Sequence, residues 1–117
     1  MVRVKSIRVQ RLEETIKEEL SQLLHQKIKD PRIGFVTITD VDLSPDLRRA
    51  VIFITIMGDD EEKEKTMAGL KSALGFLRGE LDQRLKLKCS PALEFNLDRS
   101  IDKGLRIASL LKEIDRE

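Results

Sequence analysis

A break inside a long helical pattern is the feature that most constrains the fold of this chain. From Glu62 to Leu85 the apolar side chains recur at the spacing of a helix. Gly75 lies inside this stretch, and a glycine in a helix interior costs about 1 kcal/mol relative to alanine. We therefore predict that the stretch divides at Ala73-Leu74-Gly75 into two short helices joined by a kink.

The residues at this kink also suggest a binding site. Neither Ala73 nor Gly75 carries a bulky side chain, so the backbone of a ligand can approach closely. Lys71 and Arg78 flank the kink in the sequence. Small residues between cations favour a site for a sugar-phosphate backbone, although the same residues also occur where two helices pack closely.

Periodicity predicts the remaining elements on either side of this helix pair. Asp30-Pro31 stops the first helix, and a change in the parity of apolar residues near Thr39-Asp40 indicates a β-bulge in the first strand. The predicted elements are a helix over Ser6–Ile28, strands over Phe35–Leu43 and Arg49–Met57, a third strand around 93–97, and a last helix over about 100–115.

This order predicts an α+β fold in a single domain over residues 1–117, with a short basic arm at about 1–6. The elements run α-β-β-α-kink-α-β-α, and the first two strands form an antiparallel hairpin. The strand at Arg49–Met57 is apolar on both faces, so we expect it at the centre of a small three-stranded mixed sheet. The helices should pack mainly on one face of that sheet.

Composition limits the function classes. The net charge is only +1, so affinity for nucleic acid requires charges gathered on one surface. No apolar run is long enough to span a bilayer, and no signal peptide is evident at the amino terminus. The single cysteine, Cys89, is typical of a protein in the reducing cytoplasm. We therefore expect a cytoplasmic protein without membrane contact.

Two further groups of basic residues are candidate phosphate contacts. The first group, near the amino terminus, is also consistent with an ordinary solvated end of the chain. The second recurs at every other position, which in an extended segment places it on one side, and it is also consistent with a protected sheet edge. The groups are Arg3, Lys5, Arg8 and Arg11, and then Arg84, Lys86 and Lys88.

Catalytic and metal sites find little support. His25 and Cys89 are the only residues of their kinds; they are predicted on separate elements and cannot form a common zinc site. The acidic residues Asp40, Asp42 and Asp46 lack the spacing of a calcium loop. The acidic run at Asp59–Glu62 is explained by the dipole of a helix start. We expect no enzyme, no cofactor and no metal.

Four segments of the chain resemble the bacterial ribosome-binding factor A family, and the order of elements resembles a type II KH domain. The segments read KDPRIG, VTITDVDLSPDLRRAVIFI, ALGFLRGEL and LKLKCSPALEFNLDRSIDKG, and they cover Lys29–Gly34, Val36–Ile54, Ala73–Leu81 and Leu85–Gly104. The resemblance implies a KH-like fold in which an Ala-x-Gly kink replaces the Gly-x-x-Gly loop. That kink falls on Ala73-Leu74-Gly75.

The resemblance also implies a non-catalytic factor that binds the free small (30S) ribosomal subunit. Such factors assist late maturation and processing of 16S rRNA near its 5′ end, including adaptation to cold. The partners would then be 16S rRNA and the free subunit, with no small-molecule substrate, and the protein would act as a monomer. A KH-like groove clamps the nucleotide backbone, which suits a chain with four phenylalanines and no Tyr or Trp.

The rival prediction is a protein-interaction adaptor with the same α+β fold. It would dock through the exposed face of the sheet or through the acidic loop at Asp59–Glu62. Binding to several phosphates weakens steeply as salt rises, whereas an adaptor should show a shallow dependence. Salt dependence therefore separates the two hypotheses.

Overall fold

The structure is a computed structural model that describes residues 5–86 and 90–98. The order of helices and strands agrees with the prediction throughout this part of the chain. The helix predicted over about 100–115 lies outside the described residues. The elements are α1 (Ile7–Gln26), β1 (Val36–Leu43), β2 (Arg49–Ile56), α2 (Asp60–Ser72), α3 (Leu74–Leu85) and β3 (Ala92–Leu97).

The three strands form one mixed sheet in the order β1-β2-β3. β1 and β2 pair antiparallel, and β2 and β3 pair parallel. The predicted bulge in β1 is confirmed, because the register with β2 shifts between Ile38 and Asp40. The prediction that the strand with two apolar faces lies at the centre is confirmed as well.

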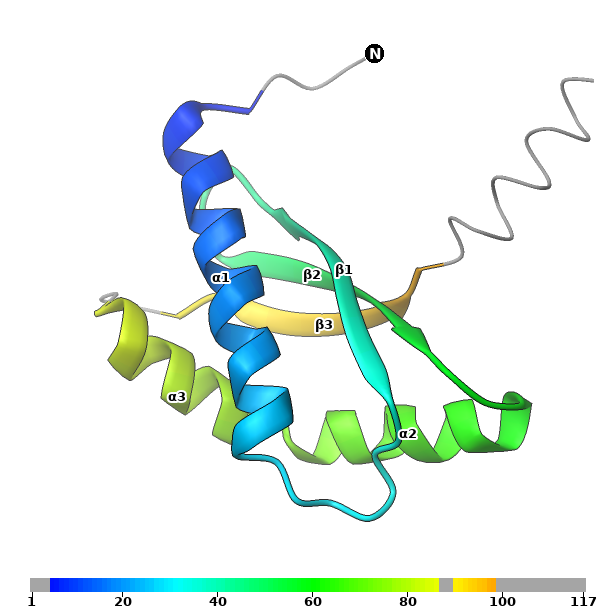
Figure 1. Cartoon of the computed structure of the whole chain (residues 1–117). Coiled ribbons are helices and arrows are strands. Elements are labelled where there is room, and N and C mark those ends of the chain that lie inside the picture. Colours follow the sequence, from blue (N-terminus) through cyan, green and yellow to red (C-terminus); the bar gives the residue numbers. More distant parts are fainter. Residues whose placement is uncertain (1–4, 87–89, 99–117) are drawn as a thin grey trace, which may run out of the picture.

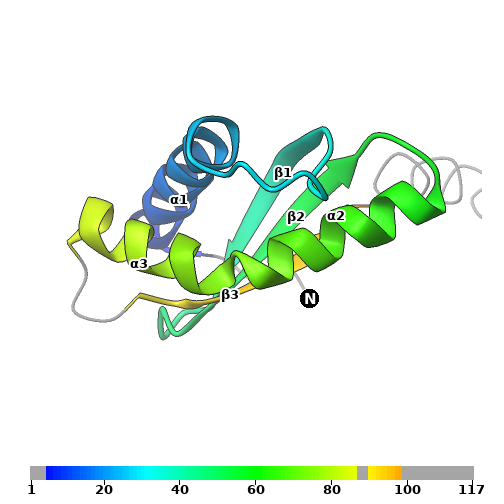
Figure 2. The same cartoon turned by 90° about the horizontal axis from the view of Figure 1, so that it is seen from below.

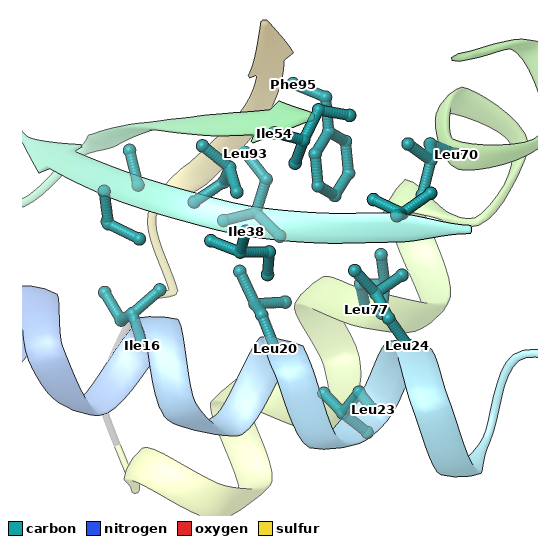
Figure 3. Close-up of a cluster of buried hydrophobic side chains, with 14 of the residues drawn as sticks. Ile16, Leu20, Leu23, Leu24, Ile38, Ile54, Leu70, Leu77, Leu93 and Phe95 are labelled. Atoms are coloured by element: carbon teal, nitrogen blue, oxygen red, sulfur yellow. The ribbon is translucent and has the colours of Figure 1, made fainter. Parts of the chain in front are cut away.

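One face of the sheet is buried under the helices (Figures 1 and 2). The β2 residues that face this side are all buried, at alternate positions from Ala50 to Ile56. In Figure 3, Leu20 of α1 points toward Ile38 of β1, and Leu77 of α3 lies beside Leu24. The other face is less covered, since Val51, Phe53 and Thr55 of β2 are only half-buried. Burial of these side chains therefore holds α1, α2 and α3 on one side of the sheet.

Side chains cap the helix starts as their sequence suggests. The hydroxyl of Ser6 accepts a hydrogen bond from the backbone N–H of Val9 at 3.2 Å and begins α1. The carboxylate of Asp59 accepts one from the N–H of Glu62 at 2.8 Å and begins α2. The acidic run at Asp59–Glu62 thus forms the cap and first turn of α2, where negative charge is favoured by the helix dipole.

α1 ends at Gln26, two residues before the predicted end at Ile28. The N–H groups of Lys27 and Ile28 both bond to the carbonyl oxygen of Leu23, at 2.9 and 3.2 Å. The bond from Ile28 spans five residues instead of the four of an α-helix, so the helical pattern ends before Asp30. The segment from Lys27 onward is therefore an irregular connection that leads from α1 to β1.

No helix in the described ranges 5–86 and 90–98 is long and apolar enough to cross a membrane.

Candidate nucleic-acid interface

The predicted kink is confirmed. α2 ends at Ser72 and α3 begins at Leu74, so Ala73 alone joins the two helices. The N–H of Ala73 bonds to the carbonyl oxygens of Gly69 and Leu70, both at 3.1 Å. α3 has no side-chain cap and no acidic residue in its first turn. Figure 1 shows that the axes of α2 and α3 meet at an angle at this point.

The three kink residues differ in exposure. Ala73 and Leu74 are half-buried and pack against the core. Gly75 is exposed, and a Cβ atom placed on it would have no other atom within 4 Å. The kink therefore presents a bare stretch of backbone to solvent at the start of α3. The positive end of a helix dipole favours phosphate at such a position.

An open cavity of about 430 Å³ lies beside the kink, and we call it the kink cavity. One wall is the connection that follows α1, and the other is the end of α2 and the start of α3. The cavity is lined by Lys27, Ile28, Lys29, Asp30, Pro31, Ser72, Ala73 and Phe76. The fold thus brings a segment from the first quarter of the chain against the kink.

The charge of the kink cavity is positive. Lys27 and Lys29 are exposed and have no ion-pair partner among the residues that the structure describes. Asp30 is engaged by Arg32, whose guanidinium Nη2 lies 2.7 Å from the Asp30 carboxylate. Hydrogen bonds from the side chain and backbone of Arg32 lower the pKa of Asp30. Two lysines are thus left to attract an anion.

Lys27 and Lys29 line the kink cavity but are not among the predicted phosphate contacts. Lys29 begins one of the segments that resemble the ribosome-binding factor A family, and this is the one signal in the sequence that could have identified it. The charge pattern gave no such signal, because both lysines follow an ordinary amphipathic helix. Their place opposite the kink depends on the path of the chain between α1 and β1.

The two cations predicted beside the kink lie on other sides of it. Lys71 is exposed on the last turn of α2 and lines a second, larger groove with Met67 and Leu97. Arg78 is exposed on α3, and its guanidinium donates to the carbonyl oxygen of Ser90 at 3.3 Å. The groove at Lys71 is also lined by Asp60, Glu64 and Asp98, so the cations near the kink do not form a single positive row.

The predicted extended geometry around Arg84 and Lys86 is wrong. Arg84 lies in the last turn of α3, and Lys86 caps that helix with a left-handed backbone at φ 52°. The Nη1 atom of Arg84 contacts Glu19 of α1 at 2.7 Å, so this side chain ties α3 to α1. Lys86 is exposed, and Lys88 lies outside the described residues.

The cations predicted near the amino terminus do not all have the same role, since one is held in ion pairs and two others are exposed. Lys5 forms ion pairs with Glu13 and Asp42. Its partial burial lowers the pKa, but hydrogen bonds to Asp42 and Glu13 outweigh that effect and raise it. Arg8 and Arg11 are exposed on α1, and Arg3 lies outside the described residues. At 1.5 Å per residue, Arg8 is about 30 Å from the kink cavity along α1.

The other chemically active residues are dispersed. His25 is exposed on α1, and Cys89 lies outside the described residues. Asp42 pairs with Lys5, while Asp46 accepts hydrogen bonds from the hydroxyl of Ser44 and the N–H of Arg48 within its own turn. Within the described ranges, no three His, Cys, Asp or Glu residues lie close enough together to hold a metal ion.

Comparison with known proteins links this geometry to one family. The family model described as ribosome-binding factor A matches residues 8–111. A solution NMR structure of a Thermotoga maritima protein, proposed to be a ribosome-binding factor A, is 33% identical. It has a TM-score of 0.71, and the match covers 81% of this chain and 91% of that one.

Two structures from Thermus thermophilus are also similar. The crystal structure of its ribosome-binding factor A is 26% identical with a TM-score of 0.68, over 76% of this chain and 93% of that one. A homology model of the same factor, fitted into a cryo-EM map of its complex with the 30S subunit, is 25% identical. Its TM-score is 0.59, over 82% of this chain and 97% of that one.

Proposed function

Because this chain belongs to the ribosome-binding factor A family, we propose that it binds the free 30S ribosomal subunit as an assembly factor without catalytic activity. It assists late maturation and processing of 16S rRNA near the 5′ end, including during growth in the cold, and acts as a cytoplasmic monomer. The observation that carries this proposal is the exposed glycine at the kink beside a positively charged cavity. A relative from Thermus thermophilus was fitted into a map of its 30S complex, which supports the choice of partner.

The chemistry of the proposed contact is electrostatic and geometric. A phosphate of 16S rRNA approaches the bare backbone at Gly75, where no side chain blocks it. Lys27 and Lys29 on one side, and Lys71 and Arg78 on the others, neutralise neighbouring phosphates. The protein binds one conformation of the RNA more tightly than others and raises its population. No bond is formed or broken.

The remaining predicted cations contribute at a distance from the kink. Arg8 and Arg11 form a second contact roughly 25–30 Å away along α1, so the subunit must present two backbone segments about that far apart; Arg3, which lies outside the described residues, is kept as a proposed contact from the sequence alone. Lys86, at the end of α3, extends the contact, and Lys88, which lies outside the described residues, is kept as a proposed contact from the sequence alone. Lys5 and Arg84 act through their ion pairs, which hold α1 against β1 and α3.

Sedimentation with purified ribosomal particles tests the proposed function. The protein should pellet with free 30S subunits and remain in the supernatant with mature ribosomes. If the four cations around the kink each contact a phosphate, affinity should fall about 50-fold between 50 and 200 mM salt. Equal pelleting with both particles, or none with either, would contradict the proposal.

A protein-interaction adaptor remains the second candidate, and one observation favours it. Phe35 and Met57 are 66% and 72% exposed, and the N–H of Met57 donates to the carbonyl oxygen of Phe35 at 3.1 Å. This apolar pair adjoins a cavity of about 440 Å³ next to the start of α2. A shallow salt dependence of subunit binding would favour a protein contact at this pair.

Neutralising one lysine tests whether the cations act at a site. Lys71→Gln should weaken binding to the 30S subunit several-fold and lower the slope of log affinity against log salt by about one. Lys65→Gln is the matched control, since Lys65 is exposed on the same helix but pairs with Glu61 at 3.5 Å. Equal losses in the two variants would indicate diffuse attraction to RNA instead of a defined contact.

A further inference from the structure

One aromatic ring stands out in the kink cavity. Phe76 is 45% exposed although it follows directly on the kink residues. The other phenylalanines lie elsewhere: Phe95 is buried in the core, Phe53 is half-buried on β2, and Phe35 is at the far end of α2. An exposed ring inside a cavity lined by lysines combines the two features that bind unpaired nucleotides, a stacking surface and a positive charge.

We propose that the kink cavity holds one unpaired nucleotide of the RNA, with its base stacked on Phe76 and its phosphate held by Lys27 and Lys29. This inference rests on the proposed function and adds the class of RNA, which is single-stranded at the kink. It departs from the expectation that the protein clamps only the nucleotide backbone. Phe76 is then the residue that distinguishes an unpaired strand from a duplex.

The size and polarity of the cavity fit this occupant. Its volume of about 430 Å³ lies in the usual range of small-ligand sites, roughly 300–1,000 Å³, but the cavity is wide open to solvent, so it offers a surface for a base to lie on instead of an enclosure. The hydroxyl of Ser72 donates to the carbonyl oxygen of Ala68 at 3.1 Å, and Asp30 is paired with Arg32. Lys27 and Lys29 are therefore the groups in the cavity best placed to bind a phosphate.

The position of the ring relative to the kink supports one continuous strand of RNA. Phe76 is the neighbour of Gly75, and adjacent Cα atoms are about 3.8 Å apart. Gly75 does not itself line the kink cavity, and successive helical positions point about 100° apart, so a strand with a phosphate at Gly75 and a base on Phe76 turns around the start of α3. In a duplex the bases are stacked on one another, so none is free to stack on the ring.

The test compares two phenylalanine variants in binding to free 30S subunits. Phe76→Leu keeps an apolar side chain and removes the aromatic ring, and we expect a loss of affinity of about 5- to 100-fold. Phe76→Tyr is the matched control at the same position, since it keeps the aromatic ring, and it should bind as the wild type does. The salt slope should stay the same in both variants because no charge changes.

A competition experiment tests the class of RNA with the wild-type protein. Unstructured single-stranded RNA should displace the protein from the subunit, and a duplex of the same length should compete at least several-fold less well. A fluorescent base analogue, 2-aminopurine, placed in the single strand should be quenched by the wild type and not by Phe76→Leu.

The outcomes separate this inference from the proposed function. If both phenylalanine variants bind the subunit as tightly as the wild type, the proposal of a stacked base is refuted. The proposal of an assembly factor is then unaffected. Equal competition by duplex and single strand refutes it as well. If the wild type does not bind the subunit at all, the proposed function fails and the inference fails with it.

Discussion

Gly75→Gln should lower affinity for the free 30S subunit by about 5- to 150-fold while the protein becomes slightly more stable. In the free protein a new Cβ meets no atom within 4 Å, and replacing a helical glycine with glutamine gains about 0.5 kcal/mol. In the complex the same side chain occupies the space of the RNA backbone, and overpacking of this kind costs roughly 1–3 kcal/mol. Pelleting and thermal unfolding measure the two effects separately.

Gly79→Gln provides the control for this prediction. Gly79 is also exposed on α3, and a Cβ on it also has no neighbour within 4 Å. It lies one helical turn, about 5.4 Å, farther from the kink, so it should gain the same stability and lose much less affinity. An equal loss of affinity in the two variants would place the contact along α3 and not at the kink.

Gly69→Val should lower the free energy of unfolding by roughly 1–3 kcal/mol. A Cβ at Gly69 would lie 2.7 Å from Cγ1 of Ile33, so the connection between α1 and β1 would have to move. That connection is also held to α2 by Thr66, whose hydroxyl accepts from the N–H of Gly34 at 3.2 Å and donates to the carbonyl oxygen of Arg32 at 3.3 Å. Because the same connection forms one wall of the kink cavity, subunit binding should weaken too.

The neighbouring position gives this prediction its control. Ala68 is exposed on α2, and Ala68→Val should cost only the difference in helix propensity, about 0.5 kcal/mol. Propensity alone predicts the opposite order, since valine is a better helix former than glycine. Chemical denaturation of both variants decides the matter. A Gly69→Val protein as stable as the wild type would mean that Ile33 moves aside without cost.

The helices and strands were predictable because their signals are local. The kink follows from the glycine inside a helical pattern, and the bulge in β1 follows from the change of parity near Asp40. The central position of β2 follows from its two apolar faces. Each of these features depends on residues a few positions apart, so periodicity alone reveals it.

Local patterns did not predict which cations are free to bind RNA and which are already paired with a carboxylate. Arg84 looked like one of three alternating basic residues, but its partner Glu19 is 65 positions away in the sequence. Lys5 appeared to belong to a free basic arm, and it pairs with Asp42 of β1. The requirement for glycine at position 69 was not predictable either. It arises because Ile33, on another segment, leaves no room for a Cβ atom there.

The sequence by itself determined the elements, their order and the place where the helix pair bends, since side-chain spacing and glycine act within a few residues. Only the tertiary structure decided which cations have no carboxylate partner among the described residues, and which segment lies opposite the kink across the cavity. Lys27 and Lys29 line the same cavity as Phe76 because α1 and the kinked pair cover the same side of the sheet (Figure 1). Contacts of this kind are set by packing between distant segments, and no local pattern encodes them.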